Sequence, residues 1–235
     1  MIPGIFAGQM SQGAGSGDPY WGDVEMLLHF NGTAGSTTFT DSKGLRTLTP
    51  FGTAQISATS KFGTGSGSFD ASGDYLTVSP VINLSSGDFT IEWWVKFETT
   101  LLVNPVLSSR NGAQGYQVFS CYASGLLRVV WQQWAPSTTY EIIDVSVAKT
   151  LGSWVAVCIE RVGDVVTAYA DGVAIGTLTT ANRPSTAPTV CHIAQDSGAP
   201  GATLNGLIDE LRITKRTGGR YGGAYTPSAS AFPDY

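Results

Sequence analysis

The chain has 235 residues, a formal net charge of −5 at pH 7 and only 13% charged residues. Nucleic-acid binding requires a concentrated basic surface, and the 13 Lys and Arg residues are scattered, so we expect no nucleic acid as a partner. No stretch reaches the roughly 18 apolar residues of a membrane span, so we expect no membrane insertion. The length suits one large β-sandwich, and the 29 glycines favour many short strands joined by turns.

Residues 1–20 predict a flexible arm outside the core, because they are rich in Gly, Ser, Gln and Pro and show no sustained period. The arm begins with Ile2, Pro3, Ile5 and Phe6, which suit docking into a neighbouring subunit. The alternative is an arm that folds back on its own domain or stays disordered. The start also lacks the positive region and long apolar run of a secretory signal, so we expect the protein to be made in a cytoplasm.

From residue 21 onwards, runs of β-prone residues alternate with turns, and no amphipathic helix or internal repeat is visible. The clearest strand is Phe89–Phe97, whose odd-numbered residues predict a core face, with Glu92, Trp94 and Lys96 on the opposite face. Further strands are expected at 24–30, 54–60, 67–78, 116–122, 126–134, 140–147 and 154–161, followed by hairpins that turn near 163–164 and at 171–172.

The three cysteines, Cys121, Cys158 and Cys191, are odd in number and far apart in the sequence. They therefore predict neither a disulfide framework nor a zinc site. We expect buried thiols, which agrees with a reducing compartment.

The last 32 residues divide into a strand and an irregular tail. In the strand, 204–214, period-two alternation places Asp209 with Leu211 on one face and Glu210 on the other. After Thr214 the alternation stops, and rings spaced along a Gly- and Ser-rich segment predict a strap over 215–235, packed on the sandwich or on a neighbour. The rings are Tyr221, Tyr225 and Phe232.

This ending, LNGLIDELRITKRTGGRYGGAYTPSASAFPDY, resembles the closing segment of laminin-G-like, concanavalin A-like domains in tailed-bacteriophage proteins. In those domains an IDELRITK strand leads through an ARY step to a TPP…FPDY-like end, from which 216–219 and 228–230 depart. Four earlier segments fit the same pattern in order: LLHFNGTAGSTTFTDSKG, KFGTGSGSFDASGDYLTV, DFTIEWWVKF and SWVAVCIERVGDVVTAYADGVAIGTL. The resemblance implies an all-β fold, a jelly-roll sandwich of two antiparallel sheets, over 21–214.

The resemblance also implies a non-enzymatic bacteriophage virion structural protein, either a head decoration or a tail component, anchored through the arm. Its partners would be other virion proteins, with a homo-oligomer in the particle, and its location would be the virion after synthesis in the bacterial host cytoplasm. The alternative is a tail adhesin, a receptor-binding module that recognises host-surface polysaccharide.

A glycoside hydrolase is the third hypothesis, because the superfamily includes glucanases. Retaining glycosidases need two carboxylates about 5 Å apart, and in the superfamily's glucanases these resemble an E-x-D-x-x-E strand, which this chain lacks. The two histidines, His29 and His192, lie in no nucleophile motif, and His29 within an apolar run is typical of a satisfied core histidine. We therefore predict no enzymatic activity.

A structural calcium ion is a further possibility, because domains of this kind often bind one at a sheet edge. Asp41 and Asp209 match positions that supply carboxylates in the family, and loop carbonyls would complete the oxygen shell. The alternative is that Asp41 caps its turn and Asp209 pairs with a neighbouring strand.

The run 128–134 predicts a glycan-binding face. Alternation places Arg128, Gln132 and Trp134 on one side, and Tyr140 joins them across a turn. A ring beside an amide and a guanidinium is a combination that holds sugars. The alternative is that Trp131 belongs to the core and Trp134 covers a sheet edge.

Overall fold

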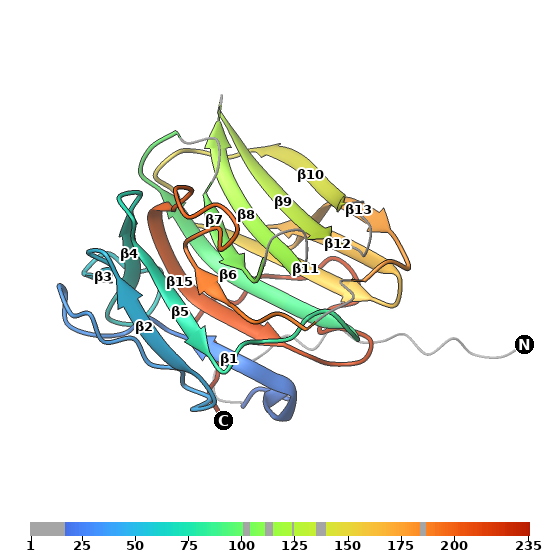
Figure 1. The fold of residues 1–235 in the computed structure, drawn as a ribbon, viewed down its shortest axis with the longest axis horizontal. Helices are drawn as coiled ribbons and strands as arrows, with labels where there is room; N and C mark the ends of the chain where they lie inside the picture. Colours follow the sequence, from blue (N-terminus) through green and yellow to red (C-terminus); the bar gives the residue numbers. More distant parts are fainter. Residues whose placement is uncertain (1–16, 101–103, 111–114, 124, 135–139, 184–186) are drawn as a thin grey trace, which may run out of the picture.

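The computed structural model describes residues 17–100, 104–110, 115–123, 125–134, 140–183 and 187–235. Two antiparallel sheets pack face to face, and the described helical structure is a single 3-10 turn, η1 (Trp21–Asp23) (Figure 1). No helix among these residues is long and apolar enough to cross a membrane. The prediction of an all-β sandwich of two antiparallel sheets is confirmed.

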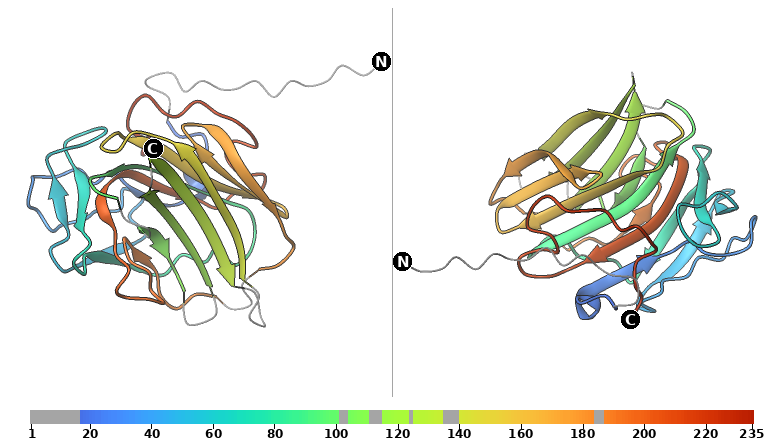
Figure 2. Two further views of the ribbon diagram at one scale, coloured as in Figure 1. Left: turned by 90° about the horizontal axis from the view of Figure 1, so that it is seen from above. Right: turned by 180° about the vertical axis from the view of Figure 1, so that it is seen from behind.

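The eight-stranded sheet lies behind in Figure 1 and faces the viewer in the right panel of Figure 2. Its strands, in spatial order, are β13 (Val173–Thr179), β12 (Val165–Ala170), β11 (Val155–Val162), β6 (Phe89–Phe97), β15 (Asn205–Thr214), β4 (Ser66–Asp70) and β3 (Gln55–Ser57), with β1 (Val24–Leu28) paired to β15. Figure 2 also shows the C-terminal tail running across the outer face of this sheet.

The seven-stranded sheet faces the viewer in Figure 1. Its strands, in spatial order, are β10 (Tyr140–Ala148), β9 (Leu126–Trp134), β8 (Gly115–Ala123), β7 (Pro105–Ser108), β14 (His192–Ile193), β5 (Tyr75–Ser79) and β2 (Thr47–Phe51).

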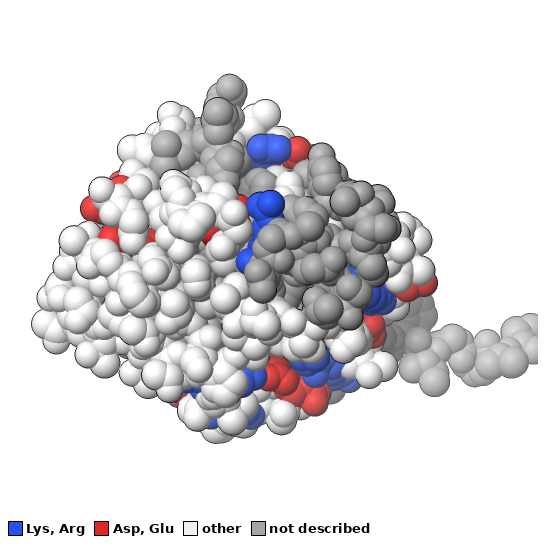
Figure 3. Space-filling view, viewed as in Figure 1, with Lys and Arg blue, Asp and Glu red and all other residues white. Residues whose placement is uncertain are grey.

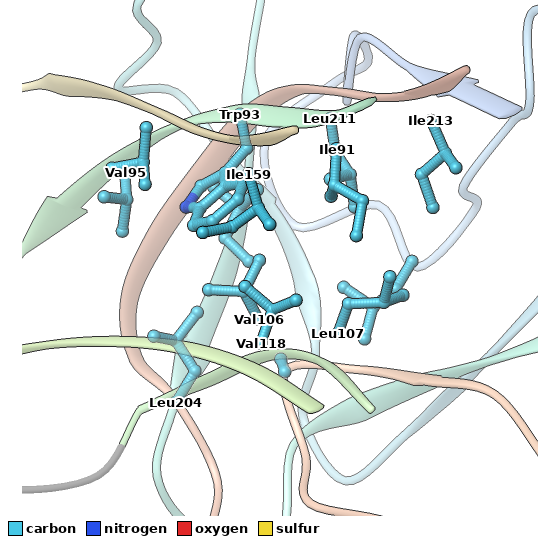
Figure 4. Close-up of a cluster of buried hydrophobic side chains, with 14 of the residues drawn as sticks. Ile91, Trp93, Val95, Val106, Leu107, Val118, Ile159, Leu204, Leu211 and Ile213 are labelled. Atoms are coloured by element: carbon cyan, nitrogen blue, oxygen red, sulfur yellow. The ribbon is translucent and has the colours of Figure 1, made fainter. Parts of the chain in front are cut away.

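The core between the sheets follows from the alternation in β6. Its odd-numbered residues, Phe89 to Phe97, are all buried in the main hydrophobic cluster, as predicted. Figure 4 shows Ile91, Trp93 and Val95 facing Val106 and Val118 of the other sheet. Burial of such side chains contributes about 1.5–3 kcal/mol each, which makes this ladder a main source of stability.

The alternation predicted for β15 is wrong, because a β-bulge interrupts the strand. Asp209 lies opposite Trp94 and Arg212 opposite Glu92, so three steps along β15 face two steps along β6. Glu210 takes a φ of +50° at this point. One extra residue shifts the parity of the side chains. Ile208 therefore shares the core with Leu211 and Ile213. Asp209 and Glu210, which we expected on opposite faces, both lie on the outer face.

The boundary of the expected arm also differs in the structure. Residues 17–20, which we assigned to the arm, are part of the packed domain: the Asp18 side chain is fully buried, and its backbone N–H donates to the carbonyl of Tyr235 at 2.8 Å. The apolar residues Ile2, Pro3, Ile5 and Phe6 lie outside the described residues. The two ends of the described domain therefore meet at one place.

The thiols of Cys158 and Cys191 are free and buried, as expected. Burial raises the pKa of Cys191 to about 12, so this thiol stays protonated near neutral pH. The side chain of Cys121 lies outside the described residues.

Candidate functional site

The outer face of the eight-stranded sheet carries an ion network beneath the tail. Arg212 donates from Nε to Glu92 Oε1 and from Nη1 to Asp18 Oδ2, both at 2.9 Å, and Arg220 of the tail binds Asp18 through Nη2 at 2.6 Å. All four side chains are at most 3% exposed. Burial lowers the pKa of Arg212, but the carboxylates of Glu92 and Asp18 outweigh this and raise it above its ordinary value. Every charge in the network therefore has a partner of opposite sign.

A second carboxylate on this face, Glu160, sits in a nest of backbone N–H groups from the tail. Arg220 and Gly222 each donate to it at 2.7 Å, and Tyr221 donates at 3.0 Å. Gly219 makes the turn possible, because its φ is +68° and a Cβ there would lie 2.6 Å from the Glu160 carboxyl carbon. Concave arrangements of N–H groups of this kind bind anions, so the sequence TGGRYGG holds the tail on an acid of its own sheet.

The rings of the tail complete this closure. Tyr221 and Tyr225 stack at 3.8 Å between ring centroids, and Tyr225 meets Tyr169 of β12 edge-on. The hydroxyl of Tyr221 donates to Glu92, and Tyr225 hydrogen-bonds the thiol of Cys158. The expected strap thus packs on its own sandwich in the structure.

The end of the tail is pinned at Glu210. One oxygen of this carboxylate binds His29 Nδ1 at 2.7 Å, and the other accepts from the backbone N–H of Phe232 at 2.8 Å. The ring of Phe232 lies under the Arg212 guanidinium, 3.7 Å from its central carbon. His29, which we expected in the core, is a half-buried residue of this outer face, and it is satisfied by Glu210.

The two carboxylates named as calcium ligands are surrounded by N–H donors. Asp41 accepts from the backbone of Leu27, Lys43, Leu45 and Arg46 at 2.9–3.1 Å. Asp209 accepts from the backbone of Lys61 and Phe62 at 2.7 and 3.0 Å, and from that of Glu210. Among the described residues, no group of three or more His, Cys, Asp or Glu side chains could hold a metal ion. Calcium binding stays a prediction.

The predicted glycan-binding residues lie on β9 and β10 of the seven-stranded sheet. Arg128 and Gln132 are half-buried, and Trp134 pairs with Tyr140 through the backbone, although the side chains of these two lie outside the described residues. Arg128 Nε donates to Asp144 Oδ1 at 2.6 Å, and this bond lowers the pKa of Asp144. Sequence reasoning missed Asp144 as the partner of Arg128.

Trp131 points to the other side of β9, as one of our alternatives predicted. Its ring is buried in the core, 5.1 Å from Phe89 and 5.7 Å from Tyr116 between centroids. The outward direction of Arg128 and Gln132 follows from the same alternation.

The register of the seven-stranded sheet reveals a polar row that the sequence did not. Residues paired across six neighbouring strands form one line on the outer face: Thr49, Thr77, His192, Ser108, Gln117 and Gln132. These residues come from distant parts of the chain, so only the pairing of the strands places them together.

A loop over 194–203 divides this row in the middle. Asp196 and Ser197 of the loop bind the hydroxyl of Ser108, at 3.4 and 2.9 Å, and Ser108 and Gln117 are buried. The row is therefore open at two ends. One end carries Gln132, with Arg128 four residues away on the same strand, and the other lies on β14, β5 and β2. Figure 3 shows that the surface over β2 and β5 is largely free of charged side chains.

The family is decided by a sequence comparison that covers most of the sandwich. Residues 70–218, more than half of the chain, match the model of the concanavalin A-like lectin/glucanase superfamily. The chain belongs to this superfamily. No curated protein matches it.

Several solved structures share the fold of this superfamily member. The binding domain of Paraclostridial Mosquitocidal Protein 1 aligns with a TM-score of 0.66 at 15% identity, over 84% of this chain and 50% of that one. The binding domain of botulinum neurotoxin serotype D aligns with a TM-score of 0.64 at 12% identity, over 85% and 50%. The chain thus spans about half the length of these structures, and at such identities the likeness establishes the fold alone.

Proposed function

We propose that the chain is a non-enzymatic bacteriophage virion protein that displays a lectin-like sandwich, and that the outer face of its seven-stranded sheet binds a host-surface glycan. The observation that carries the proposal is the contrast between the sheets. The outer face of one sheet is closed by the protein's own tail, whereas that of the other presents polar side chains and rings. The fold, shared with toxin binding domains, agrees with a binding role.

The position of the chain ends supports display from a larger particle. Asp18 and Tyr235 meet beside the eight-stranded sheet, where Asp18 binds Arg212. An arm that leaves before Gly17 therefore starts on the side opposite the proposed ligand face. Anchoring through residues 1–16 would leave the seven-stranded sheet free to point outward. The virion location itself rests on the resemblance of the chain's ending to phage domains.

The carboxylate beside the predicted face argues for binding rather than hydrolysis. A glycosidase needs one acid that is protonated at working pH, with a raised pKa. The hydrogen bond from Arg128 lowers the pKa of Asp144 instead, so Asp144 stays ionised. It therefore suits the fixing of Arg128 and not proton donation.

Binding of the purified chain to host cells and to their isolated surface polysaccharide tests the ligand part of this proposal. We expect saturable binding that Trp134→Ala and Gln132→Ala weaken by about tenfold or more, the loss of roughly 1.4 kcal/mol of binding free energy. Val173→Ala, at a 63% exposed position on edge strand β13, is the matched control and should bind normally. Equal binding by all variants would exclude the predicted face, and release of reducing sugar would overturn the non-enzymatic assignment.

Particle imaging tests the virion part. We expect the protein on the head or tail of particles, and loss of its density when residues 1–16 are deleted. The deletion stops before Gly17, because Asp18 belongs to the buried network. Full occupancy by the truncated chain would exclude the arm as the anchor, and absence of the full chain from particles would refute the virion role.

A further inference from the structure

We infer that the open end of the polar row on β2, β5 and β14 is a second ligand site, formed by Thr49, Phe51, Tyr75, Thr77 and His192, which takes a neutral sugar ring. The inference rests on the proposed function for its class of ligand only. It uses other side chains than the predicted face at Arg128 and Gln132, from which the loop over 194–203 separates it.

The site begins with three rings in series across three strands. Phe51 stacks on Tyr75 with centroids 4.6 Å apart and planes 3° apart, and Tyr75 lies 5.0 Å from His192 at a tilt of 31°. Phe51 is on the outermost strand of the sheet and is 42% exposed. One side of a pyranose ring presents C–H groups, which pack on an exposed aromatic surface of this kind, while its hydroxyls point to the rim.

The hydrogen bonds around His192 fix what it offers to a ligand. Gln195 donates from Nε2 to the carbonyl of Pro200 at 3.0 Å, so its Oε1 faces His192 Nδ1, also at 3.0 Å. An amide oxygen only accepts, and therefore Nδ1 carries the proton and Nε2 has a free lone pair. Among the described residues, nothing hydrogen-bonds His192 Nε2. This nitrogen is also absent from the buried polar atoms that lack a partner, so it is accessible. It is thus available to a hydroxyl donor.

The remaining groups favour a neutral ligand with hydroxyls. Thr49 and Thr77 are paired in register beside the rings, and each hydroxyl can donate and accept. Burial lowers the pKa of His192, so its ring is uncharged at neutral pH. A phosphate or carboxylate is bound most strongly by cationic donors, and the site formed by these residues supplies only hydroxyls and the lone pair of a neutral imidazole.

The size of the site limits its occupant. Three strands cover two strand spacings, about 10 Å. Beyond His192 the loop closes the row, with Ser197 bound to Ser108. The space fits one or two pyranose rings, so we expect a disaccharide unit and not a long chain crossing the whole sheet.

A stacked pair across two strands also stabilises a sheet without any ligand. Variants that preserve the fold can distinguish the stabilising role from the ligand-binding role. Thr77→Val preserves the shape and β-propensity of a half-buried strand position, and Tyr75→Phe removes one hydroxyl only. Phe51→Ala removes the ring, and Leu126→Ala, at another exposed apolar position of the same sheet, is its control.

The experiment is a titration of the full chain with neutral disaccharides of glucose, galactose, mannose and N-acetylglucosamine, followed by NMR of the His192 and Tyr75 rings and the Gln132 side-chain amide. We expect at least one disaccharide to shift the His192 and Tyr75 signals. We also expect its affinity to fall about tenfold in Phe51→Ala and by several fold in Thr77→Val and Tyr75→Phe, with Leu126→Ala unchanged. A disaccharide containing glucuronic acid should bind more weakly.

The outcomes also separate this inference from the proposed function. Shifts at Gln132 without shifts at His192 and Tyr75 would support the predicted face and overturn the second site. Shifts at His192 that survive unchanged in Phe51→Ala and Thr77→Val would overturn the assignment of these side chains. No shift at His192 and Tyr75 with any disaccharide at about 20 mM would overturn it as well, whereas binding to host polysaccharide at Gln132 would still uphold the proposed function.

Discussion

The two outer faces of the sandwich differ in whether their polar groups are buried or accessible. On the eight-stranded sheet, Glu92, Glu160 and Arg212 are buried beneath the tail and are saturated by Arg220, Tyr221 and backbone N–H groups. On the seven-stranded sheet, the hydroxyls, amides and rings at the two ends of the polar row remain accessible. The cluster of charged groups on the eight-stranded sheet thus holds the protein's own chain.

The energetic logic of the closed face supports this distinction. Taking charges out of water is expensive unless each is paired and hydrogen-bonded. The tail satisfies this condition with Arg220 and with the N–H groups that surround Glu160. Because the charged groups of this face are bound to the tail, they hold the tail in one register and few of them are free to bind a ligand.

The largest expected effect comes from replacing an arginine with methionine on the closed face, compared with the same replacement on the open face. Arg212→Met leaves two buried carboxylates, Asp18 and Glu92, with Arg220 as their one remaining cation, and we expect a loss of about 3–5 kcal/mol in unfolding free energy. Arg128→Met removes a half-exposed partner of Asp144, and we expect less than about 1 kcal/mol. Urea denaturation of both variants provides the measurement. Equal losses would remove the energetic difference between the faces.

Glycine substitutions in the tail test the nest around Glu160. Gly219→Ala adds a Cβ that would meet the Glu160 carboxyl, whereas Gly222→Ala, at a φ of +63°, has nothing within 4 Å. Both variants carry the left-handed strain of about 1–2 kcal/mol, and we expect only Gly219→Ala to lose more. Amide hydrogen exchange at residues 220–222 should accelerate much more in Gly219→Ala. Similar exchange in both variants would show that the nest does not hold the tail.

The two faces are also expected to respond differently to pH. Burial raises the pKa of Asp209 on the closed face to about 7, with a further contribution from Glu210, while Arg128 lowers that of Asp144 on the open face. Since the folded pKa of Asp209 exceeds its unfolded value of 3.8, its contribution to stability is full below pH 3.8 and is lost as the pH rises through 7. Carbon-13 NMR titration of the two carboxyl groups measures both pKa values and the direction in which each is shifted. Titration of both groups near pH 4 would contradict the account.

The sequence predicted the sandwich because its strongest signals are local. The alternation in Phe89–Phe97 and the turn at Asp171 and Gly172 each depend on a few neighbouring residues, and both appear in the structure. The bulge in β15 escaped prediction, because Glu210 adopts its positive φ for reasons of tertiary packing and carries no glycine signal. One shifted residue was enough to bring Asp209 and Glu210 to the same face.

The site was less predictable than the fold. Arg128 and Gln132 lie four residues apart on one strand, so their common face followed from alternation. His192, Thr77 and Phe51 come from three strands, and nothing in their local sequence indicates the register that joins them. The role of Asp18 escaped for the same reason, because its partners Arg212 and Arg220 lie about 200 residues away in the chain.

The central claim is that ligand binds on the seven-stranded sheet while the tail keeps the opposite face closed. Chemical-shift mapping of the full chain with fragments of host-surface polysaccharide tests it most directly. The account predicts shifts at Gln132 or at Thr77 and His192, with Tyr221 and Tyr225 unchanged. Shifts confined to Tyr221, Tyr225 and the strands beneath them would place the ligand on the closed face and contradict it.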